Sequence, residues 1–261
     1  MKKILVPVDF SDNARNAFTY AQELALYLDA DIKVVHFAHP SVDPVNPYLT
    51  VPTDAFPKHK VKQLKEFVSK AMEPQLATVL TEANVQQEVE LGFAAEDIVR
   101  YTKSGEFDLV VMGTTGAGGV INQVFGSVSS HVSQHAACPV LFVPADTPFR
   151  DFDNILYASN YHSADDDVLR QITDFAGLFP ANIHLVHVNE TKKKGDYQFE
   201  EHLLEQIFRK KAPELEFRMV TVQSENAWTG LRQYARENGV DLIVLASLHR
   251  NFWQRLWHKS V

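Results

Sequence analysis

The chain has 261 residues, of which 45% are hydrophobic and 22% are charged, and its formal net charge is −8. This length supplies enough apolar material for two ordinary cores, and the acidic balance argues against a broad nucleic-acid surface, which needs clustered Lys and Arg. The single cysteine, Cys138, excludes an internal disulfide and a cysteine-based zinc site, and no apolar run reaches the roughly 20 residues of a membrane span.

A strand pattern begins directly at the N-terminus, with an apolar run from Ile4 to Val8. It leaves no room for the apolar segment and cleavage site of a signal peptide, so we expect a cytoplasmic protein. Further short β-branched runs predict strands over residues 32–37, 85–91, 109–112 and 140–143. Apolar residues at helical spacing predict helices over residues 13–28, 61–80 and 95–102, the first capped by Ser11 or Asp12. Strands that alternate with helices indicate a doubly wound α/β layer with a parallel sheet.

The segment 38–57 has prolines at positions 40, 44, 47, 52 and 57, which is too many for regular structure. It connects a strand to the following helix at the edge where such sheets bind ligands. We expect a loop there, which either covers part of a ligand pocket or packs on the surface.

The pattern repeats in the second half of the chain. At an offset of 151 residues, 4–10 aligns with 155–161 and 32–37 with 183–188; at an offset of 133, 108–113 aligns with 241–246. Strands are expected over residues 154–158, 183–188, 215–221 and 242–245, and residues 145–151 are the expected linker. The predicted domains are therefore 1–146 and 152–261, and the second lacks a counterpart of the last helix and fifth strand of the first.

A glycine motif follows the strand at 109–112: Gly113-Thr-Thr-Gly116, nine residues, then Gly126-Ser127-Val128-Ser129. Glycines at a strand exit let main-chain amides approach a phosphate, and a Ser-rich helix start attracts anions. The motif therefore favours nucleotide binding; the alternative is a structural turn that needs positive φ.

Five separated elements resemble the universal stress protein family in the family's order. They are residues 4–11 (Ile-Leu-Val-Pro-Val-Asp-Phe-Ser), the Leu91-Gly92 turn, residues 108–113, the glycine motif, and residues 138–143 (Cys-Pro-Val-Leu-Phe-Val). The first half matches over nearly its full length, and the glycine spacing is that of the family's ATP-binding branch. The resemblance implies two tandem sheets of order 3-2-1-4-5, like those of adenine nucleotide alpha hydrolases, and dimers made through fifth strands.

The resemblance also implies a set of nucleotide-binding residues. Pro7, Val8, Asp9 and Phe37 would surround the adenosine, Met112 and Gly113 the ribose and the phosphate entry, and Gly116, Gly126, Ser127, Val128 and Ser129 the phosphates. A carboxylate at Asp9 can accept from ribose hydroxyls or help to hold Mg²⁺, although it could instead cap a helix. Thr115 stands where relatives often carry a cation, which leaves ATP, ADP and AMP all open as ligands.

The second half departs from the motif. Asn160, Ala246, His249 and Lys259 stand where the first half has Asp9, Gly113, Gly116 and Gly126, so we expect no ATP binding of the family type there. Residues 249–259 mix basic side chains with aromatic ones at helical spacing. They are expected to cover the sheet, the alternative being a surface that binds a partner or an anion.

Other candidate residues favour structural roles. His36 and His187 hold equivalent places in apolar runs and are expected to be core histidines, and Cys138 an inert core thiol. The apolar segment Val140–Val143 is expected at a sheet edge, where it would join two copies in a homodimer. The predicted function is an ATP-binding regulatory stress protein with at most slow hydrolysis. The rivals are a nucleotide-free scaffold and an adenylate-forming or nucleotidyl-transferring enzyme, for which no phosphate-gripping segment is found.

Overall fold

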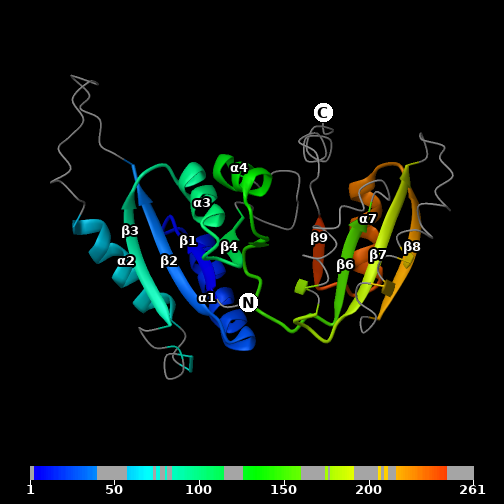
Figure 1. The fold of residues 1–261 in the computed structure, drawn as a ribbon, viewed down its shortest axis with the longest axis horizontal. Helices are drawn as coiled ribbons and strands as arrows, with labels where there is room; N and C mark the ends of the chain where they lie inside the picture. The colour runs from blue at the N-terminus through cyan, green and yellow to red at the C-terminus, as the bar shows by residue number, and fades with distance from the viewer. Residues whose placement is uncertain are drawn as a thin grey trace, which may run out of the picture. The chain divides into compact units, whose positions relative to one another are not determined.

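The computed structural model describes residues 3–39, 58–72, 75–76, 80, 84–114, 126–159, 174–175, 177–190, 205–206, 209–210 and 216–245. The chain separates into two compact units, Met1–Phe149 and Arg150–Val261, each built around a parallel sheet (Figure 1). No helix in the described part of the chain combines the length and the hydropathy needed to cross a bilayer.

The first unit contains five parallel strands in the order β3-β2-β1-β4-β5, as the sequence predicted. Its elements follow the expected alternation: β1 (Lys3–Pro7), α1 (Asp12–Leu28), β2 (Asp31–Ala38), α2 (Lys58–Ala71), β3 (Val85–Leu91), α3 (Ala94–Lys103), β4 (Leu109–Gly113), α4 (Ser127–His135) and β5 (Val140–Val143). The strand β5 lies at the edge of the sheet, beside β4 alone.

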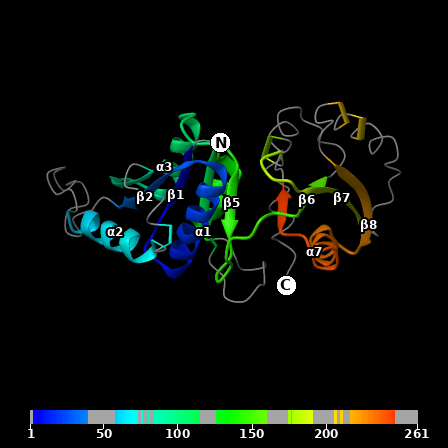
Figure 2. The ribbon, with the colours of Figure 1, turned by 90° about the horizontal axis from the view of Figure 1, so that it is seen from below.

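Helices cover both faces of this sheet. Figure 2 shows α1 and α2 on one side and α3 on the other, where α4 packs against α3. The side with α3 and α4 holds a core in which Leu5, Val35 and Val110 meet Ile98 and Val132. Successive strand residues face opposite sides, so Ile4, Val34 and Val111 belong to the side of α1 and α2.

The helix α1 forms as its sequence predicts. Its buried face includes Ala17, Phe18, Ala21 and Leu24. The side chain of Ser11 accepts a hydrogen bond from the amide of Ala14 at 3.2 Å, which decides the cap in favour of Ser11.

The prediction for the second helix was wrong at both ends. The helix α2 begins at Lys58 and ends at Ala71, and the described residues 75–76 and 80 are turn and bend rather than helix. Proline stands at position 74, and a proline disfavours helical backbone in the residue before it and removes a helical donor. The apolar spacing beyond residue 71 therefore does not continue the helix.

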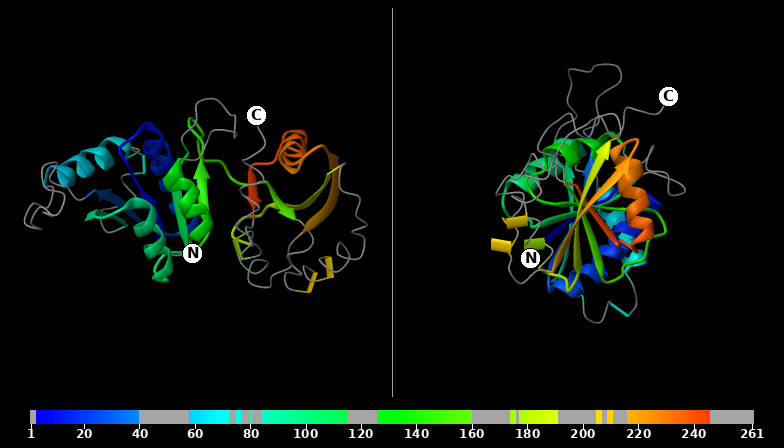
Figure 3. Two further views of the ribbon diagram at one scale, coloured as in Figure 1. Left: turned by 90° about the horizontal axis from the view of Figure 1, so that it is seen from above. Right: turned by 90° about the vertical axis from the view of Figure 1, so that its right-hand side faces the viewer.

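The second unit has a sheet of order β8-β7-β6-β9, also parallel. Its described strands are β6 (Asn154–Ser159), β7 (Asn182–Glu190), β8 (Phe217–Ser224) and β9 (Leu242–Leu245), and α7 (Ala227–Glu237) precedes β9. The strand β8 starts two residues later and ends three residues later than predicted. Figure 3 shows α7 against one face of this sheet, where Leu231 and Tyr234 pack on Leu156 and Val186.

Candidate functional site

The order of the first sheet creates a switch point between β1 and β4. From β1 the chain passes to β2 and β3 on one side, and then returns to β4 on the other side of β1. The connections that leave β1 and β4 at their carboxyl ends therefore run in opposite directions. The crevice that forms between such connections is where doubly wound sheets bind ligands.

Four of the expected site residues converge at this switch point. Leu5 pairs with Val110, and continuing the register by two residues brings Pro7 level with Met112 and Val8 level with Gly113. On the other flank, Pro7 pairs with Val35 of β2. The sequence thus places the ends of three strands at one edge, as the glycine motif requires.

Two of the expected nucleotide-binding residues have side chains that are buried in the core. Phe37 is 7% exposed and Met112 6% exposed, and both belong to the cluster under α3 and α4. The Phe37 ring packs edge-on against Tyr101, with centroids 5.9 Å apart. These residues form the floor of the edge rather than projecting from it.

Asp9 is exposed and shapes the turn between β1 and α1. Its Oδ1 accepts a hydrogen bond from the amide of Ser11 at 3.0 Å, the geometry of a turn that precedes a helix. Its Oδ2 makes no hydrogen bond to any residue in the described part of the chain. Asp9 therefore has a structural role and still offers one carboxylate oxygen to a ligand.

The backbone conformation of Phe10 was not expected from its sequence context. Its φ is +68°, in the left-handed region that a bulky residue rarely adopts. The ring lies 4.1 Å from the ring of His36, centroid to centroid, and edge-on to Phe67 at 5.7 Å, while Lys60 Nζ lies 5.1 Å from its centroid. These contacts from β2 and α2 hold the strained residue in place.

His36 joins β2 to the same turn. Its Nδ1 lies 2.8 Å from the carbonyl oxygen of Val8, which only accepts, so Nδ1 carries the proton. Burial is the largest effect and lowers the pKa of His36; the bond to Val8 opposes it, the charge of Lys60 lowers the pKa further, and Asp9 has a smaller raising effect. His36 and His187 are 9% and 7% exposed, so both lie in the interior as expected.

Gly113 has a packing role that the phosphate argument did not include. A Cβ atom at this position would lie 2.6 Å from the carbonyl oxygen of Asn13 and 2.7 Å from its carbonyl carbon. Any larger residue would push α1 away from the end of β4. Glycine is thus needed for the close approach of helix and strand, with or without a ligand.

The helix α4 begins without a side-chain cap. Gly126, the N-cap residue, has extended backbone with φ −65° and ψ 170°, and no side chain of the described residues caps the first turn. The first intrahelical bond recorded there runs from the amide of Ser130 to Gly126, so the amides of Ser127, Val128 and Ser129 lack helical acceptors. Ser127 is exposed, whereas Ser129 is 6% exposed. Main-chain amides and the Ser127 hydroxyl are what this helix end offers to an anion.

Several expected features lie outside the described residues. They are Thr115, Gly116, the proline-rich segment from residue 40 to 57, Asn160, Ala246, His249, Lys259 and the tail 249–259.

Two other expectations concern reactive groups. Cys138 packs against the core cluster, and burial, together with the Asp108 carboxylate, raises the pKa of its thiol to about 12. Such a thiol is unreactive, as expected. In the part of the chain that the structure describes, no three His, Cys, Asp or Glu side chains gather as metal ligands. A divalent ion at Asp9 would therefore depend on oxygens from a bound molecule.

The segment after β5 packs on the first unit. The Nδ2 of Asn16 donates to the carbonyl oxygens of Pro144 at 2.8 Å and of Thr147 at 3.4 Å. The Phe149 ring lies edge-on to Tyr20, with centroids 5.2 Å apart. The first half of the expected linker is thus attached to α1.

Comparisons with known proteins agree with this architecture. The model of the universal stress protein family matches residues 1–144 and 151–261, which is nearly the whole chain in two copies. A universal stress protein of Methanocaldococcus jannaschii is 32% identical over 144 residues, covering 54% of this chain and 81% of the relative. One from Thermus aquaticus is 35% identical over 145 residues, covering 54% of this chain and 98% of the relative.

A solved structure extends the likeness to both units. The crystal structure of a universal stress protein from Archaeoglobus fulgidus is similar over 93% of this chain and 86% of its own, with a TM-score of 0.65 and 20% identity. At that identity the likeness concerns the fold. Two family matches in tandem, the expected strand order and the two relatives lead to one conclusion: the chain belongs to the universal stress protein family.

Proposed function

We propose that this protein binds an adenine nucleotide at the carboxyl edge of its first sheet and acts in the cytoplasm as an ATP-responsive regulatory module of a stress response. One observation carries the proposal: the uncapped start of α4 follows the glycine segment that leaves β4 at the switch point. Unpaired amides and the positive end of a helix are a ready site for phosphate. Membership of the universal stress protein family supports the same assignment.

The proposed site uses the residues that the motif suggested. Those expected at the adenosine and ribose are Pro7, Val8, Asp9, Phe37, Met112 and Gly113, and those expected at the phosphates are Gly116, Gly126, Ser127, Val128 and Ser129. Because Val8, Phe37 and Met112 are buried, they would act as walls and through their main chain. Asp9 would use its Oδ2, the oxygen not engaged by Ser11.

Charge bears on which adenine nucleotide would bind. No cation stands at position 115, so the phosphates would be neutralised by amides and by a metal ion. Mg²⁺ commonly takes one or two carboxylates and completes its shell with phosphate oxygens and water, which fits the single carboxylate of Asp9. ATP with Mg²⁺ is our first choice, and ADP or AMP remain within the proposal.

We propose binding rather than rapid turnover. The histidine of β2 is His36, and its Nδ1 already donates to the carbonyl oxygen of Val8. The described residues around the edge contain no nucleophile paired with a base and an orienting group. Hydrolysis, if measured, should therefore be slow.

A nucleotide-free scaffold is the second candidate function. It is favoured by two structural roles. Gly113 lets α1 pack closely against the end of β4, and Asp9 stabilises the turn between β1 and α1. Isothermal titration with ATP and Mg²⁺ separates the two functions, since a scaffold of this kind gives no saturable heat.

Protein purified without added nucleotide provides a further test. The sample is denatured and the supernatant is analysed for released adenine nucleotides. We expect a nucleotide in proportion to the protein, and its loss when Gly116 is replaced by a bulky residue. Folded protein that repeatedly releases none, and that also shows no heat with ATP, would refute the proposed binding.

We also propose domain limits of 1–146 and 152–261. Two copies of the chain are proposed to associate through β5. This short apolar strand lies at the edge of the first sheet, where exposed main-chain groups invite pairing. Sedimentation at micromolar concentration should give a dimer, and Leu141→Lys should shift it toward monomer. A monomeric wild-type mass contradicts this assembly.

A further inference from the structure

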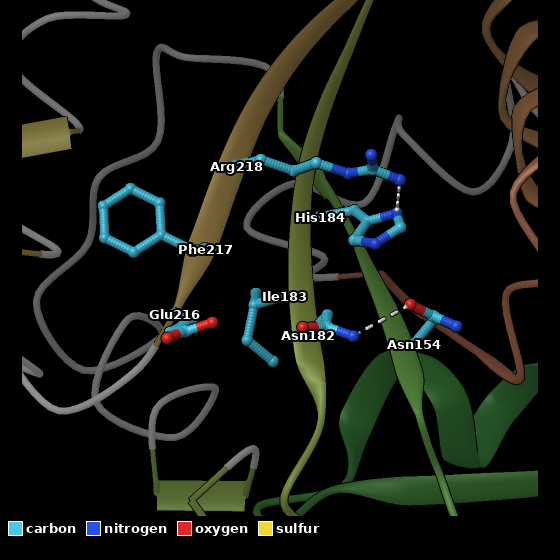
Figure 4. Close-up of a pocket in the computed structure, with 7 residues that line it drawn as sticks. All are labelled: Asn154, Asn182, Ile183, His184, Glu216, Phe217 and Arg218. Atoms are coloured by element: carbon cyan, nitrogen blue, oxygen red, sulfur yellow. Dashed lines mark hydrogen bonds between the residues drawn. The ribbon is translucent and has the colours of Figure 1, made fainter.

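A cavity of about 370 Å³ opens at the amino-terminal edge of the second sheet (Figure 4). This is the edge opposite to the one where doubly wound sheets bind nucleotides. Its lining residues come from the starts of β6, β7 and β8: Asn154, Asn182, Ile183, His184, Glu216, Phe217 and Arg218.

The strand register separates the polar lining residues from the apolar ones. His184 pairs with Arg218, and Ile183 pairs with Phe217, one position earlier on each strand. Alternate residues face opposite sides, so Asn182, His184 and Arg218 share one face. Figure 4 shows the Phe217 ring on the other side of β8 from the Arg218 side chain. The polar face is the one on which α7 packs, because Leu156 pairs with His184 and contacts that helix.

Arg218 is the cation of this cavity, and it is held only by neutral groups. Its Nη2 lies 3.2 Å from Nδ1 of His184 and donates to Oδ1 of Asn238 at 2.9 Å. Asn238 ends α7, whose C-terminal dipole also favours a cation. Tyr234 also contacts Arg218 by a side-chain hydrogen bond, and its ring centroid lies 5.9 Å from the guanidinium carbon; among the described residues no carboxylate pairs with Arg218.

His184 holds the guanidinium of Arg218 in position through its Nδ1. Arg218 cannot accept, so Nδ1 of His184 must accept from it, and the hydroxyl of Tyr234 also lies 3.3 Å from this nitrogen. The proton of the neutral ring therefore sits on Nε2, which has no recorded partner in the described part of the chain. Burial and the charge of Arg218 lower the pKa of His184, which keeps the ring neutral. The side chain is 2% exposed and lines the cavity.

At the equivalent positions of the first unit, a cation is paired with a carboxylate. Lys33 occupies the position equivalent to His184, and it forms an ion pair with Glu88 and lies over the ring of Tyr101. Tyr234 is the counterpart of Tyr101, but the position equivalent to Glu88 is Val220. In the second unit the cation is Arg218 on the neighbouring strand, and the position equivalent to Glu88 carries no carboxylate.

We infer that this cavity is a binding site for a small organic carboxylate, anchored by the guanidinium of Arg218, which His184 and Asn238 hold in position. Both protons of Nη2 are taken by His184 and Asn238, so the guanidinium would meet a carboxylate through its charge and through single hydrogen bonds from the protons of its other nitrogens. The amides of Asn154 and Asn182 supply polar contacts for the rest of the molecule. The lining holds one cation and the carboxylate of Glu216, so a singly charged anion is better balanced than a phosphate dianion. The inference is independent of the proposed nucleotide site, which lies in the other unit.

The test uses the full chain and acetate as the probe, with side-chain nitrogen NMR signals of Arg218 and His184 as the readout. Acetate should shift both signals in a saturable manner that chloride at equal ionic strength does not reproduce. Arg218→Gln should weaken acetate binding about tenfold or more, the effect of losing a charged hydrogen-bonding partner. Arg232→Gln, at an exposed position of α7, is the matched control and should bind acetate as the wild type does.

Two further measurements test which anion the site prefers. Glu216→Gln should tighten acetate binding by about threefold, because it removes a like charge that is screened by solvent. Inorganic phosphate should bind more weakly than acetate. The inference is overturned if acetate gives no saturable shift, if Arg218→Gln binds acetate normally, or if phosphate binds more tightly. None of these results depends on whether the first unit binds ATP.

Discussion

The imidazole Nδ1 of His36 lies 2.8 Å from the carbonyl oxygen of Val8, so β2 holds the turn that leaves β1. This bond, the tilted contact between the Phe10 and His36 rings and the hydrogen bond of Asp9 to the Ser11 amide fix the backbone from Val8 to Ser11. In the proposed function, the same turn presents Asp9 to the nucleotide. The rigidity of one flank of the site thus depends on a buried side chain that need not touch the ligand.

Replacing His36 by Phe should destabilise the fold and loosen this turn. An aromatic ring in contact with Phe10 is retained, but the carbonyl of Val8 loses its donor. We expect a loss of about 1–3 kcal/mol in the free energy of unfolding, measured by urea denaturation. His59→Phe, at an exposed position of α2, is the control and should change stability little. Equal stability of the His36→Phe variant and the wild type would show that the bond is unimportant.

Stability should fall as the pH drops through the range in which histidine titrates. The pKa of His36 and that of His184 are both lowered in the folded protein, so the unfolded chain binds more protons below the ordinary value of 6.5. Protons then favour unfolding, and stability present above about pH 6.5 is lost below it. Urea midpoints between about pH 7.5 and 5 measure this loss. The slope should be smaller in His36→Phe; an unchanged slope contradicts the role assigned to His36.

Gly113→Ala should destabilise the protein even without any ligand. The added Cβ meets the Asn13 carbonyl at 2.6 Å, and such overpacking costs about 1–3 kcal/mol. Gly126→Ser should not destabilise it, because the backbone at Gly126 is extended and serine caps helices well. Thermal unfolding of the two variants separates them. A Gly113→Ala protein as stable as the wild type would mean that the glycine serves the ligand alone.

Cys138 should resist alkylation in the folded state. A thiol with a pKa near 12 holds little thiolate at neutral pH, and the residue packs against the core. Iodoacetamide should react on the order of a hundredfold more slowly with native protein than with protein in urea. Mass spectrometry of timed samples gives both rates. Similar rates would contradict the burial of this thiol.

The architecture was open to prediction because its signals are local and repeated. Short apolar strands that alternate with amphipathic helices predicted a doubly wound parallel sheet, the family resemblance implied the order 3-2-1-4-5, and the internal repeat predicted a second sheet. A helix cap at Ser11 or Asp12 was recognisable by its place before an apolar pattern, and the structure selects Ser11. The end of α2 was missed because apolar spacing was extended across Pro74, whose effect on the helix should have taken precedence.

The candidate site was only partly open to prediction. Residues at the carboxyl ends of strands could be assigned from the sheet order, but the role of Gly113 depends on how closely α1 approaches β4. The positive φ of Phe10 arises from tertiary contacts with His36 and Phe67, which no local pattern contains. The carboxylate site proposed at Arg218 needs the register between β7 and β8. Each of these depends on contacts between segments far apart in the sequence.

The most direct test of the central claim is calorimetric titration of ATP with Mg²⁺ into the Ser127→Glu variant. A carboxylate at the start of α4 favours the helix by about 0.3–1 kcal/mol but repels phosphates from its amides. The variant should therefore keep wild-type stability and lose ATP binding, whereas Gln134→Glu, which adds the same charge near the end of α4, should bind ATP as the wild type does. Undiminished ATP binding by a folded Ser127→Glu protein would contradict the account.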